Sequence, residues 1–245
     1  MEESTLTPTK VDPPIFIVGC GHSGTSLLLS IIGSHNQLYT IEQETNVGFV
    51  PNAEKHMARF DQETSDRSLR RWIEKSPRHI HCIPKLLKLR PNAKILLMIR
   101  DGRDVACSLQ DRYDNLDMGI NRWYKDNLAA EPYWDSPGVH IVHYESLIES
   151  YQATLEDILS FLELPYDEAV FNYHTEKKYY YANTIERPPD GKGDNHDRYR
   201  NWQINQPVYD ARGKWERMSD GEKSAFKQVA GEMLIRYSYA KDHNW

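Results

Sequence analysis

A short apolar run that breaks into glycines is the feature that most constrains how this chain can fold. The run "IFIVG" (15–19) is β-branched and aromatic, which favours a strand, and "TSLLLSIIGS" (25–34) has the apolar content of a buried helix. Between them, "GCGHSGTS" places Gly19 and Gly24 with four residues between. A strand that runs through a glycine-rich turn into a helix is the repeating unit of parallel α/β proteins.

The turn between this strand and helix is suited to hold an anion. The first turn of a helix leaves backbone N–H groups unpaired, and the helix dipole adds positive potential there. Ser23, Thr25 and Ser26 add hydroxyl donors, and beside Gly24 they are small enough to admit a phosphate closely. The alternative is that small residues only build a tight turn, but the spacing and position favour an anion site.

The rest of the chain repeats the same pattern of strands and helices. We expect a helix to about Leu89, a strand over 94–100 followed by a helix, and a strand over 139–143. After that strand, apolar residues share one helical face: Tyr151, Leu155, Ile158, Leu159 and Leu162. This order predicts an α/β fold with a central parallel sheet flanked by helices. Ligands of such sheets bind beyond the carboxyl ends of the strands, where Gly19 and Arg100 both fall.

Prolines and glycines indicate how the chain is divided. Residues 1–14 end in Pro13-Pro14 and are predicted to be a disordered or extended tail, and 15–245 a single domain. Within it, 184–214 is polar and broken by prolines and glycines, which predicts a lid or cofactor loop. The last helix carries an apolar stripe made of Phe226, Val229, Ala230, Met233 and Leu234.

The overall charge excludes some classes of partner. A formal net charge of −6 argues against a nucleic-acid or anionic-membrane binder, so any anion site must be local. The longest apolar runs are far shorter than the roughly 20 residues that cross a bilayer. The three cysteines (Cys20, Cys82, Cys107) cannot all pair, which predicts reduced thiols and a cytoplasmic protein. A Golgi lumen would fit only if an N-terminal anchor had been removed.

The residues around the anion site argue against a metal. In nucleotide triphosphatases the loop lysine neutralises the terminal phosphates and the next hydroxyl holds Mg²⁺, but here Thr25 stands in the lysine position. The strand over 94–100 ends in Arg100, which repels Mg²⁺ and attracts phosphate. The histidines of "HIH" (79–81) and "HIVH" (140–143) lack metal-ligand spacing and are predicted to be core or surface residues. A phosphate-bearing donor that needs no metal fits better.

Two motifs resemble a known family. "FIVGCGHSGTSLL" (16–28) resembles the 5′-phosphosulfate loop of sulfotransferases that use 3′-phosphoadenosine 5′-phosphosulfate (PAPS), and "MIRDGRDVACSL" (98–109) resembles their 3′-phosphate motif. The second motif places Arg100 at a strand end and Ser108 eight residues on. The resemblance implies a three-layer P-loop-like fold and a cofactor site at Ser23, Gly24, Thr25 and Ser26.

The 3′-phosphate motif also makes physical sense. A guanidinium can bind a ribose 3′-phosphate through two parallel hydrogen bonds, while the Ser108 hydroxyl adds a donor. Arg112 lies one turn beyond Ser108 and matches a further arginine of the tyrosylprotein sulfotransferases. The alternative for Arg100 is a strand-end salt bridge with Asp101 or Asp104. Exposed pairs contribute only about 0–1 kcal/mol, and two motifs at matching strand ends favour the phosphate role.

Catalytic candidates follow from the same resemblance. Sulfuryl transfer needs a base for the acceptor proton and positive groups for the developing charge. "IEQETNVGF" (41–49) resembles the segment that carries the base in tyrosylprotein sulfotransferases, which places it at Glu44, with Glu42 and His22 as rivals. Asn46 stands where those relatives have arginine, which weakens the case for a peptide acceptor. "WIEKSPRHI" (72–80) puts Lys75, beside a short strand, near the transferred group.

The remaining candidates are cofactor contacts. His22 stands where the family usually has Lys or Arg, and a phosphate beside it would raise its pKa and favour the cationic donor. A loop cap is the second role for His22, and a general base the third. Tyr144 matches a nucleotide or acceptor contact, with a half-buried core tyrosine as the alternative. "NWQINQPVYDARGKW" (201–215) resembles the relatives' lid, which adds Arg200 and Lys214.

These observations predict a PAPS-dependent sulfotransferase that moves a sulfuryl group in line to a hydroxyl, or as second choice an amine. The expected acceptor is a small molecule, glycan or peptide, the expected product of the donor is PAP, and no metal is expected. No nucleic-acid or membrane partner is expected, and a homodimer is compatible with the sequence. Two other functions stay open: a P-loop-like small-molecule kinase and a non-catalytic nucleotide-binding module.

Overall fold

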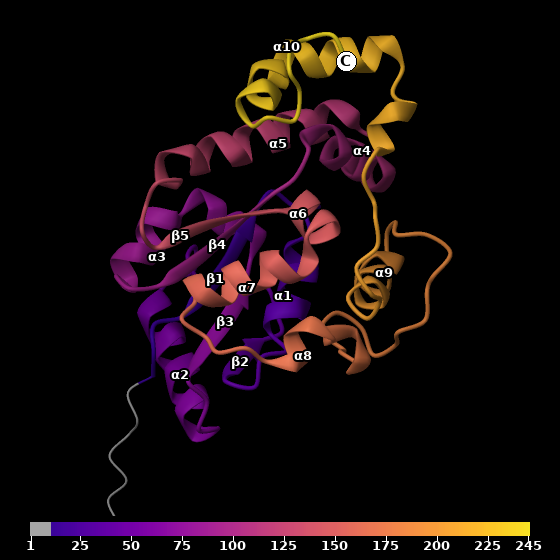
Figure 1. The fold of residues 1–245 in the computed structure, drawn as a ribbon. Helices are drawn as coiled ribbons and strands as arrows, with labels where there is room; N and C mark the ends of the chain where they lie inside the picture. The colour runs from indigo at the N-terminus through magenta and orange to yellow at the C-terminus, as the bar shows by residue number, and fades with distance from the viewer. Residues whose placement is uncertain (1–10) are drawn as a thin grey trace, which may run out of the picture.

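The computed structural model describes residues 11–245, and these build one parallel sheet covered by helices on both faces (Figure 1). Most of the predicted tail, residues 1–10, lies outside the described residues. The five strands run in the order β2-β3-β1-β4-β5, and every neighbouring pair is parallel. Their bounds are β1 Ile15–Gly19, β2 Leu38–Ile41, β3 Arg71–Lys75, β4 Lys94–Ile99 and β5 Val139–His143.

Helices α1 to α5 lie in the connections between the strands, and α6 to α10 follow β5. They are α1 Thr25–Ile32, α2 Ala53–Asp66, α3 Ile83–Leu89, α4 Gly102–Tyr113, α5 Leu116–Ala130, α6 Tyr144–Glu149, α7 Tyr151–Phe161, α8 Glu168–Phe171, α9 Asn195–Gln203 and α10 Asp220–Arg236. Short 3₁₀ helices occur at Pro77–His81, Glu131–Tyr133, Tyr173–Thr175 and Lys214–Arg217. Within residues 11–245, no helix is long and apolar enough to cross a bilayer.

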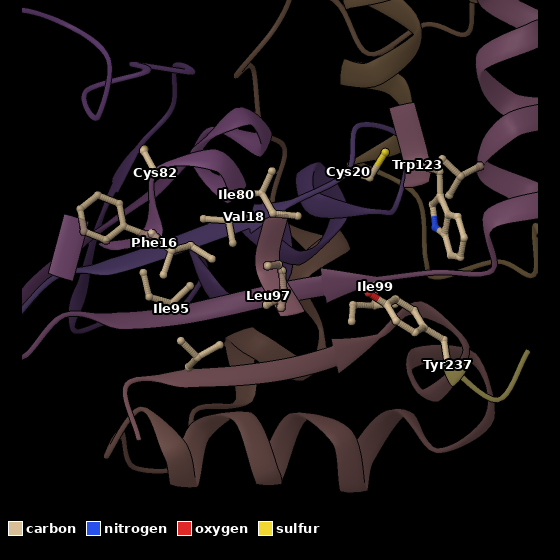
Figure 2. Close-up of a cluster of buried hydrophobic side chains, with 14 of the residues drawn as sticks. Phe16, Val18, Cys20, Ile80, Cys82, Ile95, Leu97, Ile99, Trp123 and Tyr237 are labelled. Atoms are coloured by element: carbon tan, nitrogen blue, oxygen red, sulfur yellow. The ribbon is translucent and has the colours of Figure 1, made fainter. Parts of the chain in front are cut away.

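The two faces of the sheet bury two different hydrophobic clusters. Because successive strand residues point to opposite faces, Ile15 and Ile17 pack with helices α1 and α7, whereas Phe16 and Val18 pack on the other side. The second cluster reaches from Phe16 along Ile95, Leu97 and Ile99 to Trp123 of α5 (Figure 2). Both faces of the central strands are apolar, as is typical of a parallel sheet between two helical layers.

The predicted α/β fold is confirmed, and strands β1, β4 and β5 lie where the sequence predicted them. Strand β2 was not predicted: "LYTI" is only four residues long, and its two central side chains are half-exposed. The predicted apolar stripe of α10 is wrong at Val229, which is 38% exposed, because the helix turns this residue away from the core. The segment over 184–214 is irregular except for α9 and the 3₁₀ turn that begins at Lys214.

Candidate active site

The carboxyl ends of β1 and β4 bring the two sequence motifs together. These strands are neighbours in the sheet, and Gly19 pairs in register with Met98. The glycine-rich turn that leads into α1 and Arg100, which leads into α4, therefore begin side by side. Both line one cavity of about 770 Å³ at this edge of the sheet. The place where the sequence predicted a ligand is thus hollowed in the structure.

The turn after β1 has two residues with backbone angles that favour glycine. His22 and Gly24 both have positive φ, 70° and 103°. A Cβ on Gly24 would lie 2.9 Å from Met98 Cε and 3.0 Å from Tyr144 Cδ2, so a larger residue would crowd the turn. Ser23 Oγ is buried without a hydrogen-bond partner. The turn is closely packed beneath and carries an unsatisfied hydroxyl.

Arg100 is buried at the wall of the cavity. Its Nη2 donates to Ala211 O at 2.5 Å, its Nη1 donates to His22 O at 3.4 Å, and its guanidinium stacks over the Tyr144 ring at 4.2 Å. The Nε atom is buried without a partner. Asp104 is the nearest acid, at 3.9 Å. Arg100 therefore keeps hydrogen-bonding capacity that its neighbours do not use.

The alternative of a strand-end salt bridge for Arg100 finds little support. Asp101 instead pairs with Arg103, at 2.6 Å. Asp104 accepts hydrogen bonds from the backbone N–H groups of Gly213, at 3.0 Å, and Trp215, at 3.2 Å. Both carboxylates thus have other partners, and Asp104 fastens the end of the 184–214 segment to α4.

His22 links the turn to α4, and its surroundings within the protein lower its pKa. Its Nδ1 lies 2.9 Å from Ser108 Oγ, and Arg112 lines the same cavity. Burial, followed by the charges of His196 and Arg112, lowers the pKa of His22 to about 3. The rise in pKa expected beside a bound phosphate stays a prediction, and the lowering is the effect of the protein's own groups. The sequence could not show this lowering, because the burial and the guanidinium neighbours come from separate elements.

Glu44, Lys75 and Arg200 meet in one ion cluster. Glu44 Oε1 accepts from Lys75 Nζ at 2.5 Å and from Arg200 Nη2 at 2.6 Å. Burial raises the pKa of Glu44, but the charges of Lys75 and Arg200 outweigh it and lower the pKa below its usual value. The Lys75 side chain is only 1% exposed and its Nζ lies over the Tyr181 ring, so it is not a solvated surface lysine. The rival Glu42 is exposed and does not line the cavity.

The 184–214 segment closes the cavity from the other side. Arg200 on α9 also donates to Ser26 Oγ at 3.2 Å and stacks on Tyr181 at 3.8 Å. Lys214 Nζ contacts Asp111 of α4 at 3.2 Å. Tyr144 is buried under the cavity and donates from its hydroxyl to Tyr209 O at 3.1 Å. Tyr144, Arg200 and Lys214, which were predicted from separate motifs, therefore line the same cavity.

The cavity concentrates positive charge in an acidic protein. Eight cationic but only four acidic side chains line it. The cations are Arg78, Arg100, Arg112, Arg122, Arg187, Lys192, Arg200 and Lys214, and the acids are Glu44, Asp111, Asp190 and Asp197. Of the cations, Arg78, Arg122, Arg187 and Lys192 were not predicted. Arg187 and Lys192 fall in the predicted lid and could have been noted there, whereas Arg122 on α5 carries no local signal.

All of the predicted site residues lie in or against this cavity. Ser23 and Lys75 do not line it, but Ser23 is buried within the turn and Lys75 contacts Glu44.

The histidines predicted not to bind metal have protein partners: His79 Nε2 accepts from Gly48 N at 3.0 Å, and His143 Nδ1 lies 3.1 Å from Tyr239 Oη. Within residues 11–245, no group of three or more His, Cys, Asp or Glu side chains is placed to hold a metal ion.

Comparison with known proteins points to one family. Residues 49–168, which contain Lys75, Arg100, Ser108 and Tyr144, match the sequence model of the sulfotransferase family. Protein-tyrosine sulfotransferase A of Caenorhabditis elegans is 26% identical over 202 residues, covering 67% of this chain and 53% of that protein. An uncharacterised protein of Aquifex aeolicus is 24% identical over 207 residues, covering 67% of this chain and 27% of that protein. The chain thus spans about a quarter to a half of these relatives.

Solved structures share the fold over nearly the whole chain. The sulfotransferase domain of the Synechococcus PCC 7002 olefin synthase has a TM-score of 0.63 and 17% identity, covering 92% of this chain and 95% of that one. A mouse sulfotransferase in complex with PAP has a TM-score of 0.62 and 14% identity, covering 93% and 86%. The resemblance to the sulfotransferases is confirmed: residues 49–168 match the model of that family, and the chain has the fold of solved sulfotransferases.

Proposed function

We propose that this protein transfers a sulfuryl group from PAPS to a hydroxyl acceptor, with an amine as the second choice. The observation that carries the proposal is the meeting of two anion-binding motifs in one cavity. The turn over 19–26 and the pair of Arg100 and Ser108 both line it, from neighbouring strand ends. A donor with phosphates at two places matches two such motifs.

The residues present fit an anionic donor. Ser23 Oγ and Arg100 Nε are buried without partners, and an unsatisfied buried polar group costs about 1–3 kcal/mol. An anion that accepts from them would remove that cost. The excess of cations gives the lining a net positive charge. Gly24 lets the turn pack closely on Met98 and Tyr144 at a positive φ.

Each candidate then has a binding role. The first turn of α1, with Thr25 and Ser26, holds the phosphosulfate, because its backbone N–H groups point out of the helix end. Arg100, Ser108 and Arg112 hold the 3′-phosphate. Arg200 and Lys214 close over the donor from the 184–214 segment, which we take as the lid of a single domain over 15–245.

Two further residues shape this donor site. His22, bound to Ser108, joins the turn to α4 and can donate to a phosphate held beside it. Tyr144 supports Arg100 from below through the ring that the guanidinium covers. Both residues fix the positions of groups that bind phosphate.

Glu44 and Lys75 are the catalytic pair in this proposal. Because its pKa is lowered, Glu44 is ionised near neutral pH and can accept the proton of the acceptor hydroxyl. Lys75, held against Glu44, supplies positive charge where negative charge develops during transfer. PAPS supplies the sulfuryl group and leaves as PAP, so the new sulfur–oxygen bond forms as the old one breaks and the proton stays on Glu44.

One relative and the cysteines bear on the acceptor and the compartment. The nematode relative is named for tyrosine in proteins, so tyrosine is one acceptor to test beside phenols and sugars. The three cysteines are free and buried, which supports a cytoplasmic location. The donor requires no metal in this proposal.

The proposal is tested by ligand binding and then by transfer. PAP without Mg²⁺ should raise the melting temperature, whereas ATP with Mg²⁺ should change it little. Equal responses to the two ligands would contradict the proposal and favour a small-molecule kinase. A screen with labelled PAPS over phenols, sugars and peptides then measures transfer. Binding of PAP without transfer to any acceptor would indicate a non-catalytic nucleotide-binding module.

A further inference from the structure

The segment that carries Glu44 leaves the sheet after β2 and is held by side chains instead of a strand. Four successive backbone N–H groups, those of residues 45–48, each donate to a side chain. The acceptors are Glu74 Oε1 for Thr45 (3.0 Å), Ser76 Oγ for Asn46 (2.9 Å), Thr45 Oγ1 for Val47 (3.2 Å) and His79 Nε2 for Gly48 (3.0 Å). A backbone with every consecutive donor satisfied in this way has one defined path.

Glu74 is the centre of this arrangement. Its side chain is fully buried, and Oε1 accepts from Thr45 N at 3.0 Å, Thr45 Oγ1 at 2.9 Å and Ser76 Oγ at 2.5 Å. His79 Nδ1 lies 3.2 Å from Glu74 Oε2. Because Nε2 of His79 accepts from Gly48, its ring proton is on Nδ1, which makes no hydrogen bond to the described residues. A buried carboxylate is tolerated when neighbouring donors compensate it, and here three donors contact Oε1, whereas Oε2 has no hydrogen-bond partner within residues 11–245.

Two adjacent residues at the end of β3, Glu74 and Lys75, contact this segment at different points. Adjacent strand residues project to opposite faces of a sheet, so Glu74 and Lys75 diverge. Lys75 binds the Glu44 carboxylate directly, whereas Glu74 binds the next residue, Thr45, through its backbone and hydroxyl. The Glu44 side chain is 34% exposed, so burial does not fix its position. Its position is fixed by the contact with Lys75 and by the contacts of Glu74 with Thr45.

We propose that Glu74 is a positioning residue for the transfer step: it fixes residues 45–48 and thereby holds Glu44 against Lys75. The inference rests on the proposed function of Glu44 as base. Glu74 does not line the cavity, so it acts through Glu44 and not on the substrate. A misplacement of a reacting group by about 1 Å can lower the rate on the order of 100-fold.

The first experiment compares Glu74→Ala with Glu74→Gln. In Glu74→Ala, we expect kcat per PAP-binding site to fall roughly 10- to 100-fold while the Kd for PAP changes by less than about twofold. Amide hydrogen exchange at residues 45–48 should become faster. Glu74→Gln keeps an oxygen that can accept from Thr45 and Ser76, so it should retain more of kcat. If Glu74→Ala does not fold, Ser76→Ala removes the Asn46 contact and one of the donors to Glu74, keeps both Thr45 contacts, and should give a smaller fall of the same kind.

Asp167, the N-cap of α8, offers a matched control. Its carboxylate also binds backbone N–H groups, those of Asn36 at 2.7 Å and Ala169 at 3.0 Å, but Asn36 precedes β2 whereas Glu44 follows it. Asp167→Ala should lower the melting temperature and leave kcat per PAP-binding site unchanged. An equal loss of kcat in this control would mean that lost stability, not lost positioning, explains the Glu74 variants.

A double substitution tests whether Glu74 affects kcat through Glu44 or independently of it. Glu44→Gln should lower kcat strongly alone and add little in the Glu74→Ala background, because neither variant then has a positioned base. Full additivity, or an unchanged kcat in Glu74→Ala, would overturn the proposal. If the wild-type protein transfers sulfate to no acceptor, the proposed function has failed. Hydrogen exchange then decides the inference, and unchanged exchange at 45–48 in Glu74→Ala would overturn it.

Discussion

Arg200 Nη2 lies 2.6 Å from Glu44 Oε1 and 3.2 Å from Ser26 Oγ, so one guanidinium joins the lid segment to the proposed base and to the phosphate turn. The arginine is held in place by the Tyr181 ring at 3.8 Å. Under the proposed function, a donor phosphate at Ser26 and the Glu44 carboxylate compete for the same cation, which links the charge state of the proposed base to the position of the 184–214 segment.

This link predicts a shift in the pH profile of Arg200→Ala. Arg200 and Lys75 together lower the pKa of Glu44, so the wild-type base stays ionised until the pH falls below the usual range of a glutamate. Without Arg200 the pKa of Glu44 rises, and the acid limb of kcat/KM should move to higher pH. Binding of PAP should weaken as well. An acid limb at the same pH in both proteins would mean that Arg200 does not act on the base.

Glu44→Gln should spare binding and lower turnover. Glutamine keeps the size of the side chain but cannot take a proton from the acceptor, and general-base catalysis typically contributes about 10²- to 10⁴-fold. The Kd for PAP should stay within a few-fold of wild type. Glu42→Gln is the matched control, because Glu42 is exposed and outside the cavity lining, and its turnover should not change. Wild-type turnover in Glu44→Gln would remove Glu44 as base.

Arg100→Ala should weaken the binding of PAP more than the loss of an ordinary surface arginine. A hydrogen bond to a charged group is worth about 1.5–3 kcal/mol, which corresponds to roughly 10- to 150-fold in Kd. Calorimetric titration measures the effect. Arg236→Ala serves as the comparison, because Arg236 pairs with Glu131 and does not line the cavity. Similar affinities in the two variants would show that Arg100 does not hold the nucleotide.

His22 predicts a pH dependence of stability. Its pKa is lowered from the usual 6.5 to about 3, so between these values the unfolded chain binds a proton that the folded chain excludes. Folding stability should therefore decrease as the pH falls below about 6.5, and His22→Asn should decrease less steeply. Asparagine tolerates the positive φ of this position. Melting temperatures from pH 7 to 5 measure the slopes, and parallel curves would contradict the lowered pKa.

Local patterns in the sequence predicted the parallel fold, strands β1, β4 and β5, and the position of the two phosphate motifs at one edge of the sheet. The apolar strands β1 and β4 and the residues that follow them are contiguous in sequence, so Arg100 and the turn over 19–26 could be placed at the same edge. The short strand β2, with half-exposed Tyr39 and Thr40, carries no such signal. Which helices surround a site is set by packing, so the contribution of Arg122 could not be predicted.

The electrostatics of the site were also beyond the sequence. The neutral state of His22 depends on burial and on charges from α4, α5 and α9. The ion cluster of Glu44, Lys75 and Arg200 unites a loop, a strand and a helix that are far apart in the chain. Glu44 and Lys75 were predicted separately through the family resemblance, but the contact between them appears only in three dimensions.

Strand pairing sets the separation of the two phosphate-binding motifs. The turn over 19–26 and Arg100 follow β1 and β4, which are hydrogen-bonded neighbours about 4.8 Å apart. The backbone ladder sets this spacing, which does not depend on which apolar side chains cover the sheet. Chains at 14–17% identity can therefore share the fold although most of their residues differ.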